Sequence, residues 1–414
     1  MAPAVNFLLT HALHAQPKAR QAAAASISAL LLEACASARK SVSKQACTLA
    51  TTVLKDEGSV SSHAYAIDIA KLALPCMSVK RASPLLLLVA SFAAASGGPG
   101  AASVAALAVA LGVRDTYEDD TEKDAAASAD QHAADFSVDT LKAVLDALAR
   151  ARPPASAVDL VRVWLTAVVT AAARLFKRDN RSVSLLTPAI IESLSDYFAS
   201  SAGAAVWEVA ARHLSKMGEL CVGNAAGVGD RQVVEALRAI VHPRNRASWH
   251  FSLPAVATCV RGLGAGTNMA DFVGDIGMIH RAAKENMVSV RNHVLDVLAA
   301  AMTATSPEAV VSRLAIVDPP PPGSAAVRSL KNTWLLFAFS RPGAPPCASF
   351  FMNKLLPMHD GLEAGVWPLP SLLCLFIASH SAQEPRLPMP TVCMSRPRIF
   401  GASRRRFGKQ PKRV

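Results

Sequence analysis

Apolar residues recur along most of the chain at the i, i+3, i+4 and i+7 spacing of amphipathic helices, and Gly, Pro or small polar clusters separate these segments. No stretch shows the apolar and polar alternation of a strand. The pattern predicts helices near residues 18–38, 42–56, 60–75, 84–95, 101–112, 137–151, 156–177, 187–200, 203–222, 230–241, 268–284, 287–304, 307–316, 325–339 and 348–363. We therefore expect an all-α protein whose helices are joined by turns.

Successive helices that each bury one face against their neighbours are typical of α-solenoids, whose HEAT and armadillo repeats span about 40–47 residues. We predict such an α-solenoid of HEAT/armadillo-like helical repeats over residues 1–363, with a helical bundle as the alternative. Two segments interrupt it, an acidic stretch at 114–135 that reads as a solvated loop and a Pro-rich break at 318–323. Residues 364–414 lack a helical period and are expected to form a Pro-rich, basic, disordered tail.

Composition agrees with this interpretation, because 51% of the 414 residues are hydrophobic and only 5% are aromatic, which excludes global disorder and favours closely packed helices. The formal net charge of +12 comes largely from scattered basic clusters and from the tail. These clusters predict salt-sensitive contact with nucleic-acid phosphates, without an aromatic platform for base stacking. The candidate contacts are Lys18, Arg20, Arg39, Lys40, Lys44, Arg244, Arg246, Arg291, Arg404, Arg405 and Arg406.

The sequence contains little that indicates catalysis. The P-loop pattern, short histidine ligand pairs and C-x-x-C pairs are all missing. The glycine cluster at 262–267 has Thr267 where a dinucleotide-binding loop needs its third glycine, so we interpret it as a turn between helices. We therefore predict a protein that is not an enzyme and uses no cofactor, metal or small-molecule substrate. An enzyme using this glycine turn stays as an alternative that requires a preceding strand.

An uncharged run from Ala82 to Val113 is long enough to cross a bilayer as one helix. The residues from Ser96 to Gly100 divide it, and a turn in the middle of the hydrocarbon would leave backbone groups unpaired. We therefore predict a helical hairpin and no membrane partner.

Two regions resemble the ribosomal RNA-processing protein twelve family of HEAT-repeat ribosome assembly factors. Near the start, the Pro-Lys-Ala-Arg sequence at 17–20 opens an Ala-rich helix as in that family. Further on, the Pro-Glu-Ala-Val sequence at 307–310 is followed by Trp-Leu-Leu at 334–336, Phe-Phe at 350–351 and Leu-Leu-Pro at 355–357. Phe337 departs from the pattern, since proline is expected there. The resemblance covers roughly residues 1–363, and family members extend further at both ends, so it implies a partial chain or an altered terminus.

This resemblance implies a non-catalytic scaffold in the nucleus and nucleolus that shuttles to the cytoplasm. It implies that the scaffold binds pre-ribosomal RNA and pre-ribosomal proteins, with transport factors as further partners, during small-subunit RNA processing and export. Lys18, Arg20 and Arg291 fall within the matching regions and are the first expected contacts. The alternative is a solenoid adaptor or transport receptor that binds proteins and no RNA.

Overall fold

The computed structural model describes residues 2–14, 16–33, 36–56, 60–94, 100–111, 136–199, 201–220, 222, 230–283, 287–316, 332–341 and 350, and within these ranges every regular element is a helix. The all-helical prediction is thus confirmed for the part of the chain described. The chain divides into a unit of residues 1–367 and a unit of residues 368–414. The second unit, including Arg404, Arg405 and Arg406, lies outside the described residues, as do the segments at 114–135 and 318–323.

The α-helices are α1 (Ala2–Ala12), α2 (Pro17–Glu33), α3 (Ala36–Lys55), α4 (Val60–Ala73), α5 (Val79–Ala94), α6 (Gly100–Ala110), α8 (Val138–Arg150), α9 (Val158–Phe176), α10 (Asn180–Ser195), α11 (Ala204–Leu220), α12 (Asp230–Val241), α13 (Trp249–Arg261), α14 (Ala270–Ala282), α15 (Val288–Ala304) and α16 (Pro307–Arg313). The 3-10 helices are η1 (Leu74–Cys76), η2 (Asp196–Phe198), η3 (Pro243–Ser248) and η4 (Thr333–Ser340).

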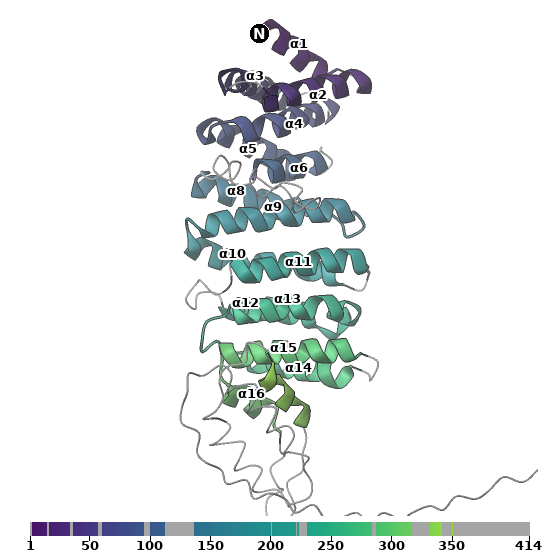
Figure 1. Ribbon diagram of the computed structural model, residues 1–414, viewed down its shortest axis with the longest axis vertical. Helices are drawn as coiled ribbons and strands as arrows, with labels where there is room; N and C mark the ends of the chain where they lie inside the picture. The colour runs from purple at the N-terminus through teal and green to yellow at the C-terminus, as the bar shows by residue number, and fades with distance from the viewer. Residues whose placement is uncertain are drawn as a thin grey trace, which may run out of the picture. The chain divides into compact units, whose positions relative to one another are not determined.

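Within the first unit, the helices form two layers, and successive helices alternate between them (Figure 1). In one layer α4, α6, α9, α11, α13 and α15 each pack against the next. In the other, α3 packs on α5, α5 on α8, α10 on α12, α12 on α14, and α14 on α16. Each helix therefore buries its apolar stripe against helices that are close to it in the sequence.

One type of hydrogen bond between consecutive helices recurs at a regular interval along the sequence. The indole nitrogens of Trp207 and Trp249 donate to the carbonyl oxygens of Ala199 and Val241, at 3.0 and 3.1 Å. The Nη2 atom of Arg291 donates to the carbonyl oxygen of Ala283 at 2.8 Å. Each donor lies eight residues after its acceptor, and positions 207, 249 and 291 follow at 42-residue intervals. The bond joins the start of one helix to the end of the helix or 3-10 turn before it.

Local sequence explains where several helices begin. Ser137 caps α8 by accepting a hydrogen bond from the Thr140 amide at 3.2 Å, and Asp179 caps α10 through the Ser182 amide at 3.0 Å. The expected helix at 187–200 therefore began too late, because Asp179 starts α10 and Pro188 is accommodated inside it. The single helix expected at 18–38 was also wrong, since α2 ends at residue 33 and α3 begins at residue 36.

Two helices were not predicted from the sequence. Helix α1 is short, and α13 is so widely apolar, with Pro254 inside it, that its period is weak. The uncharged run at 82–113 forms parts of α5 and α6, which pack against each other as the hairpin prediction requires. No described helix combines the length and apolar character needed to cross a bilayer.

The last two expected helices are described only in part. Within 325–339 the described residues form η4, a 3-10 helix, where an α-helix was expected. Of the segment 348–363 only Phe350 is described, and its ring lies 5.7 Å from that of Phe339.

Candidate nucleic-acid interface

The basic residues predicted near the start of the chain have different surroundings. Lys18 is exposed on α2, whereas the Arg20 guanidinium lies 3.9 Å above the Tyr65 ring and donates to the His14 carbonyl oxygen at 2.9 Å. Arg20 therefore holds α2 against α4 through a cation–π contact. Lys18 is the better candidate for contact with a partner.

Helices α3 and α5 together present exposed cations, which we call the α3–α5 cation group: Lys40, Lys44, Lys80 and Arg81. Lys40 and Lys44 are one turn apart in the first half of α3, and Lys80 and Arg81 are in the first turn of α5. Successive helices reverse direction, so the N-terminal halves of α3 and α5 belong to the same side of their layer. Among the described residues no carboxylate forms an ion pair with these four side chains.

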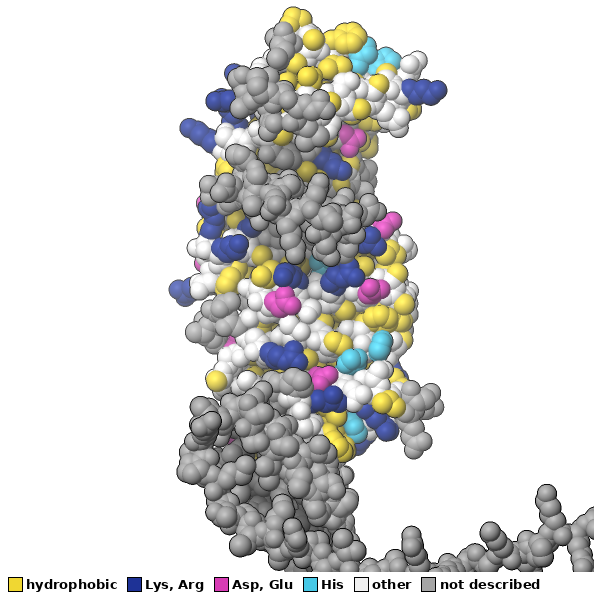
Figure 2. Space-filling model, in the orientation of Figure 1, with side chains coloured by type: hydrophobic (Ala, Val, Ile, Leu, Met, Phe, Trp, Pro, Cys, Tyr) yellow, Lys and Arg dark blue, Asp and Glu magenta, His cyan; other side chains and the backbone are white. Residues whose placement is uncertain are grey.

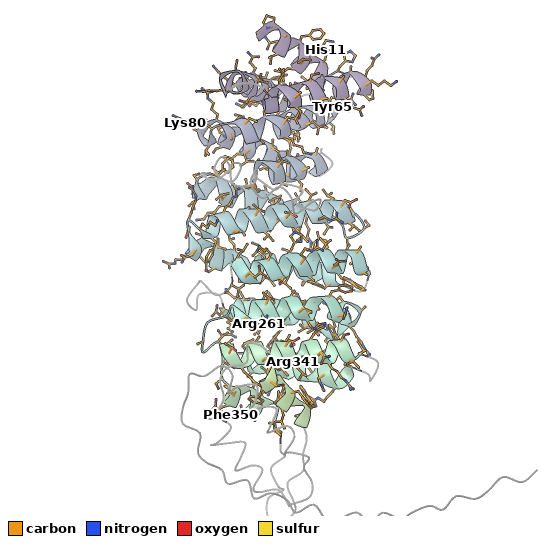
Figure 3. The ribbon with its side chains drawn as sticks, viewed as in Figure 1. His11, Tyr65, Lys80, Arg261, Arg341 and Phe350 are labelled. Carbon is orange, nitrogen blue, oxygen red and sulfur yellow. The ribbon has the colours of Figure 1, made fainter. Side chains whose placement is uncertain are left out.

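Figures 2 and 3 agree with this arrangement. Dark blue side chains lie along the left edge of the N-terminal part of the array, where Lys80 projects away from the helices. The backbone of Arg39 belongs to α3, but its side chain lies outside the described residues. The neighbouring helix α5 thus adds two exposed cations, Lys80 and Arg81, that the sequence did not indicate.

Arg246 and Arg291, predicted as phosphate contacts, converge on the C-terminal end of α14. Arg246 donates to the Ala282 carbonyl oxygen at 3.1 Å, and Arg291 donates twice to that of Ala283, at 3.2 and 2.8 Å. Cations at this end satisfy carbonyl groups that lack helical partners and complement the helix dipole. Arg244 is exposed in η3, two residues before Arg246.

Beside these arginines lies a set of rings that we call the ring strip: Trp207 on α11, His250 and Phe251 on α13, and His293 on α15. The ring centroids of Trp207 and Phe251 are 6.1 Å apart, those of Phe251 and His250 are 5.3 Å apart, and those of His250 and His293 are 5.6 Å apart. His250 is exposed and the other three are half-buried. Figure 2 shows histidines gathered among hydrophobic side chains over this part of the array.

No aromatic cluster was expected from the sequence, and the structure places four rings next to one another here. The four rings come from helices about forty residues apart, so they are not close in the sequence. The sequence contains one indication of this cluster. Trp207, His250 and His293 stand at 43-residue intervals, and this interval lies within the range of HEAT and armadillo repeat lengths.

Two histidines in this region favour the neutral state. Burial, together with the Arg291 charge, lowers the pKa of His280 to about 4, and its ring stacks on Trp334 with centroids 3.6 Å apart. Burial, followed by the nearby His250, also lowers the pKa of His293. At neutral pH both side chains are therefore uncharged rings.

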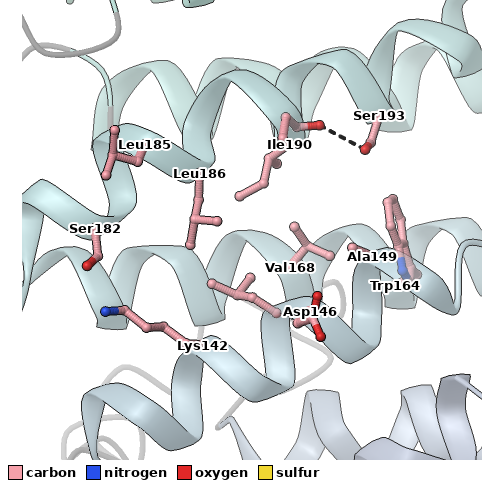
Figure 4. Close-up of a pocket in the computed structure, with 12 residues that line it drawn as sticks. Lys142, Asp146, Ala149, Trp164, Val168, Ser182, Leu185, Leu186, Ile190 and Ser193 are labelled. Atoms are coloured by element: carbon pink, nitrogen blue, oxygen red, sulfur yellow. Dashed lines mark hydrogen bonds between the residues drawn. The ribbon is translucent and has the colours of Figure 1, made fainter.

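An apolar groove of about 490 Å³ lies between α8 and α10, and residues of α9 form its floor (Figure 4). We call it the α8–α10 groove. Leu145, Val168, Leu186 and Ile190 line it, and Leu185 at its edge is 60% exposed. Elsewhere in this layer neighbouring helices pack directly, so the groove interrupts a regular arrangement.

The part of the chain that the structure describes contains no group of three or more His, Cys, Asp or Glu side chains suited to a metal ion. The glycine turn at 262–267 follows helix α13, not a strand, and Asp230 fixes it by accepting hydrogen bonds from the Gly264 amide and the Thr267 hydroxyl. The turn therefore lacks the strand that a dinucleotide loop needs.

Comparisons with known proteins found no family model and no curated protein that matches this chain. Its resemblance to the ribosomal RNA-processing family therefore stays a prediction from the quoted residues.

Proposed function

We propose that this protein is a non-catalytic α-solenoid scaffold of HEAT/armadillo-like repeats that binds pre-ribosomal RNA and assembly factors during small-subunit RNA processing and nuclear export. It would act in the nucleus and nucleolus and shuttle to the cytoplasm. Two-layer packing supports the solenoid part of the proposal. The 42-residue interval of the Trp207, Trp249 and Arg291 bonds agrees with the HEAT and armadillo repeat length.

The α3–α5 cation group is the observation on which RNA binding rests. Two neighbouring helices present four exposed positive charges without a described carboxylate partner. Such charges contact phosphates and release counterions, so the affinity falls steeply as salt rises. Binding of this kind is independent of sequence and suits a scaffold that holds a long RNA.

Fluorescence anisotropy with a labelled RNA hairpin, recorded over a range of salt concentrations, tests this proposal. We expect a log–log slope of about −0.9 for each phosphate contacted on duplex. Replacing all four cations of the group by Gln should weaken binding and make the slope shallower by up to about 3–4. A slope near zero for the wild-type chain would contradict RNA binding.

A matched control separates local contact from total charge. It removes the same number of charges at cations that each pair with an acid on their own helix: Arg150, Arg162, Arg212 and Lys216. This control should retain most of the affinity. Equal losses in both variants would mean that only net charge matters and that the α3–α5 cation group is not a binding surface.

The ribosomal part of the proposal needs a separate experiment. The tagged full chain should sediment with small-subunit precursors in a lysate gradient, and RNase treatment should release it. Sedimentation that ignores RNase would favour protein partners.

The α8–α10 groove favours a second function, a solenoid adaptor that binds proteins without RNA. Its apolar lining and the exposed Leu185 resemble grooves that receive a partner helix. Leu185→Asp should remove such partners from a pull-down while leaving RNA affinity unchanged. If RNA binding is absent and these partners are lost, the adaptor function replaces the scaffold function.

A further inference from the structure

We propose that the ring strip binds single-stranded RNA by stacking bases on Trp207, Phe251 and the two imidazoles. This inference rests on the proposed RNA binding and adds a second contact with a different chemistry. The α3–α5 cation group would hold phosphates of any RNA, whereas the ring strip requires accessible bases. The two surfaces can therefore be tested separately.

The geometry of the strip supports stacking. Four rings on three neighbouring helices form a chain of contacts of 5.3 to 6.1 Å between centroids. The Trp207 indole nitrogen is held by the Ala199 carbonyl oxygen, and the His250 Nδ1 atom lies 3.1 Å from the Ser289 hydroxyl. Because these bonds orient two of the rings beforehand, little side-chain entropy is lost when a base packs on them.

The charges around the strip favour an anionic ligand. Arg244 and Arg246 lie immediately before α13 in η3. At the α15 end of the strip, Arg341 donates to the Asn292 amide oxygen at 2.6 Å and approaches the Asp296 carboxylate at 3.6 Å, so this acid is neutralised. Cations beside aromatic faces are the combination by which proteins bind single strands without strong sequence preference.

Other occupants fit less well. In a duplex the base faces are already stacked, so aromatic side chains recognise unpaired segments. A proline-rich peptide also packs on aromatic rings, but it carries no phosphate groups that the arginines beside this strip could bind. Single-stranded RNA uses both the rings and the positive charges.

The test compares three labelled ligands on the full chain: an oligouridylate of about ten nucleotides, an abasic oligomer of equal length and charge, and an RNA duplex. We expect the oligouridylate to bind more tightly than the abasic oligomer. Phe251→Leu and Trp207→Leu keep an apolar side chain but remove the stacking face, and Trp207→Leu also loses the indole bond to Ala199, so Phe251→Leu is the cleaner test. Each should weaken oligouridylate binding about five- to hundredfold and leave duplex affinity unchanged.

Phe7→Leu is the matched control, because Phe7 is 61% exposed and also contacts a histidine, His11, with centroids 4.0 Å apart. It should leave all three affinities unchanged. His250→Ala changes an exposed residue, so it tests the strip with little effect on folding. Urea unfolding of each variant checks that the variants fold.

Equal binding of oligouridylate and abasic oligomer would overturn base stacking, as would full affinity in the Phe251→Leu and His250→Ala variants. In either case, salt-dependent duplex binding would leave the scaffold proposal standing. A labelled proline-rich peptide serves as a fourth ligand, and loss of its binding alone in these variants would assign the strip to a protein partner and overturn the proposal. If no RNA binds at any salt concentration, both proposals fail.

Discussion

The indole Nε1 atom of Trp249 donates to the carbonyl oxygen of Val241 at 3.1 Å, and both residues are buried. The bond links the end of α12 to the start of α13. Trp207 and Arg291 make the same link 42 residues before and 42 residues after it. At all three positions the side chain is long and carries an N–H donor, a property that Trp and Arg share.

Trp249→Phe should lower the free energy of unfolding by about 1–3 kcal/mol, because the buried Val241 carbonyl loses its side-chain donor and a small cavity remains. Urea unfolding followed by circular dichroism measures this change. Trp207→Phe should cost less, since Trp207 is only half-buried. Equal stability of the wild-type and Trp249→Phe proteins would show that this bond contributes nothing.

Gly218→Ala should destabilise the protein by about 1–3 kcal/mol through overpacking. A Cβ atom at position 218 of α11 would lie 2.8 Å from the backbone nitrogen of Cys259 on α13, so the two helices would have to separate. Gly274→Ala is the control, because its nearest neighbour at 3.2 Å is the Nε atom of the exposed Arg313 side chain, whose bond to Ala270 needs only a small adjustment. There the better helix propensity of Ala should raise the stability by up to about 1 kcal/mol. Thermal unfolding of both variants measures whether the two substitutions change the stability in opposite directions.

Acidification should destabilise the protein between about pH 6.5 and pH 4. The pKa of His280 is about 4 in the folded chain, against 6.5 for an exposed histidine. In this window the unfolded chain binds a proton that the folded chain does not, so the free energy of unfolding falls as the pH falls. Burial lowers the pKa of His213 and His293 as well, which adds to the effect in the same direction.

Urea midpoints at pH 7.5, 6 and 5 measure this dependence. His280→Gln should make it shallower, because the substituted side chain does not titrate. An unchanged profile in His280→Gln would mean that other groups cause the acid sensitivity.

Arg291→Ala should raise the pKa of His280, although burial should still hold it below 6.5. The Arg291 charge disfavours a second positive charge on the imidazole, and the substitution removes it. NMR titration of the His280 ring protons gives the value directly. Arg291→Lys is the control, since it keeps a positive charge at this position while losing the two-pronged bond to Ala283. A lower pKa in Arg291→Ala would contradict this explanation.

Much of the helical architecture could be predicted from the sequence, because amphipathic spacing and caps such as Ser137 are local signals. Where those signals weaken, prediction failed. Helix α13 is missing from the prediction, since its buried residues surround Pro254 on most sides and leave little polar face to define a period. Its neighbours on both sides, α11 and α15, determine its position by packing.

The candidate site was harder to predict, because the role of a charged residue depends on what lies beside it. Arg20 and Lys18 are two residues apart, yet Arg20 stacks on Tyr65 and Lys18 is exposed. The Tyr65 ring comes from α4, which no local pattern around Arg20 indicates. The ring strip escaped prediction for the same reason, since Trp207 and His293 are brought to one surface only by helix packing.

The alternation of helices between two layers also bears on how such a chain can change in length. Because each helix contacts only helices near it in the sequence, duplicating one 42-residue segment within α11 to α15 would add a helix pair and create new contacts only at the two joins. The remaining core would need no compensating substitutions. A chain packed in this way could therefore gain or lose a helix pair in a single step, and each step would shift the surfaces on either side by one helix pair.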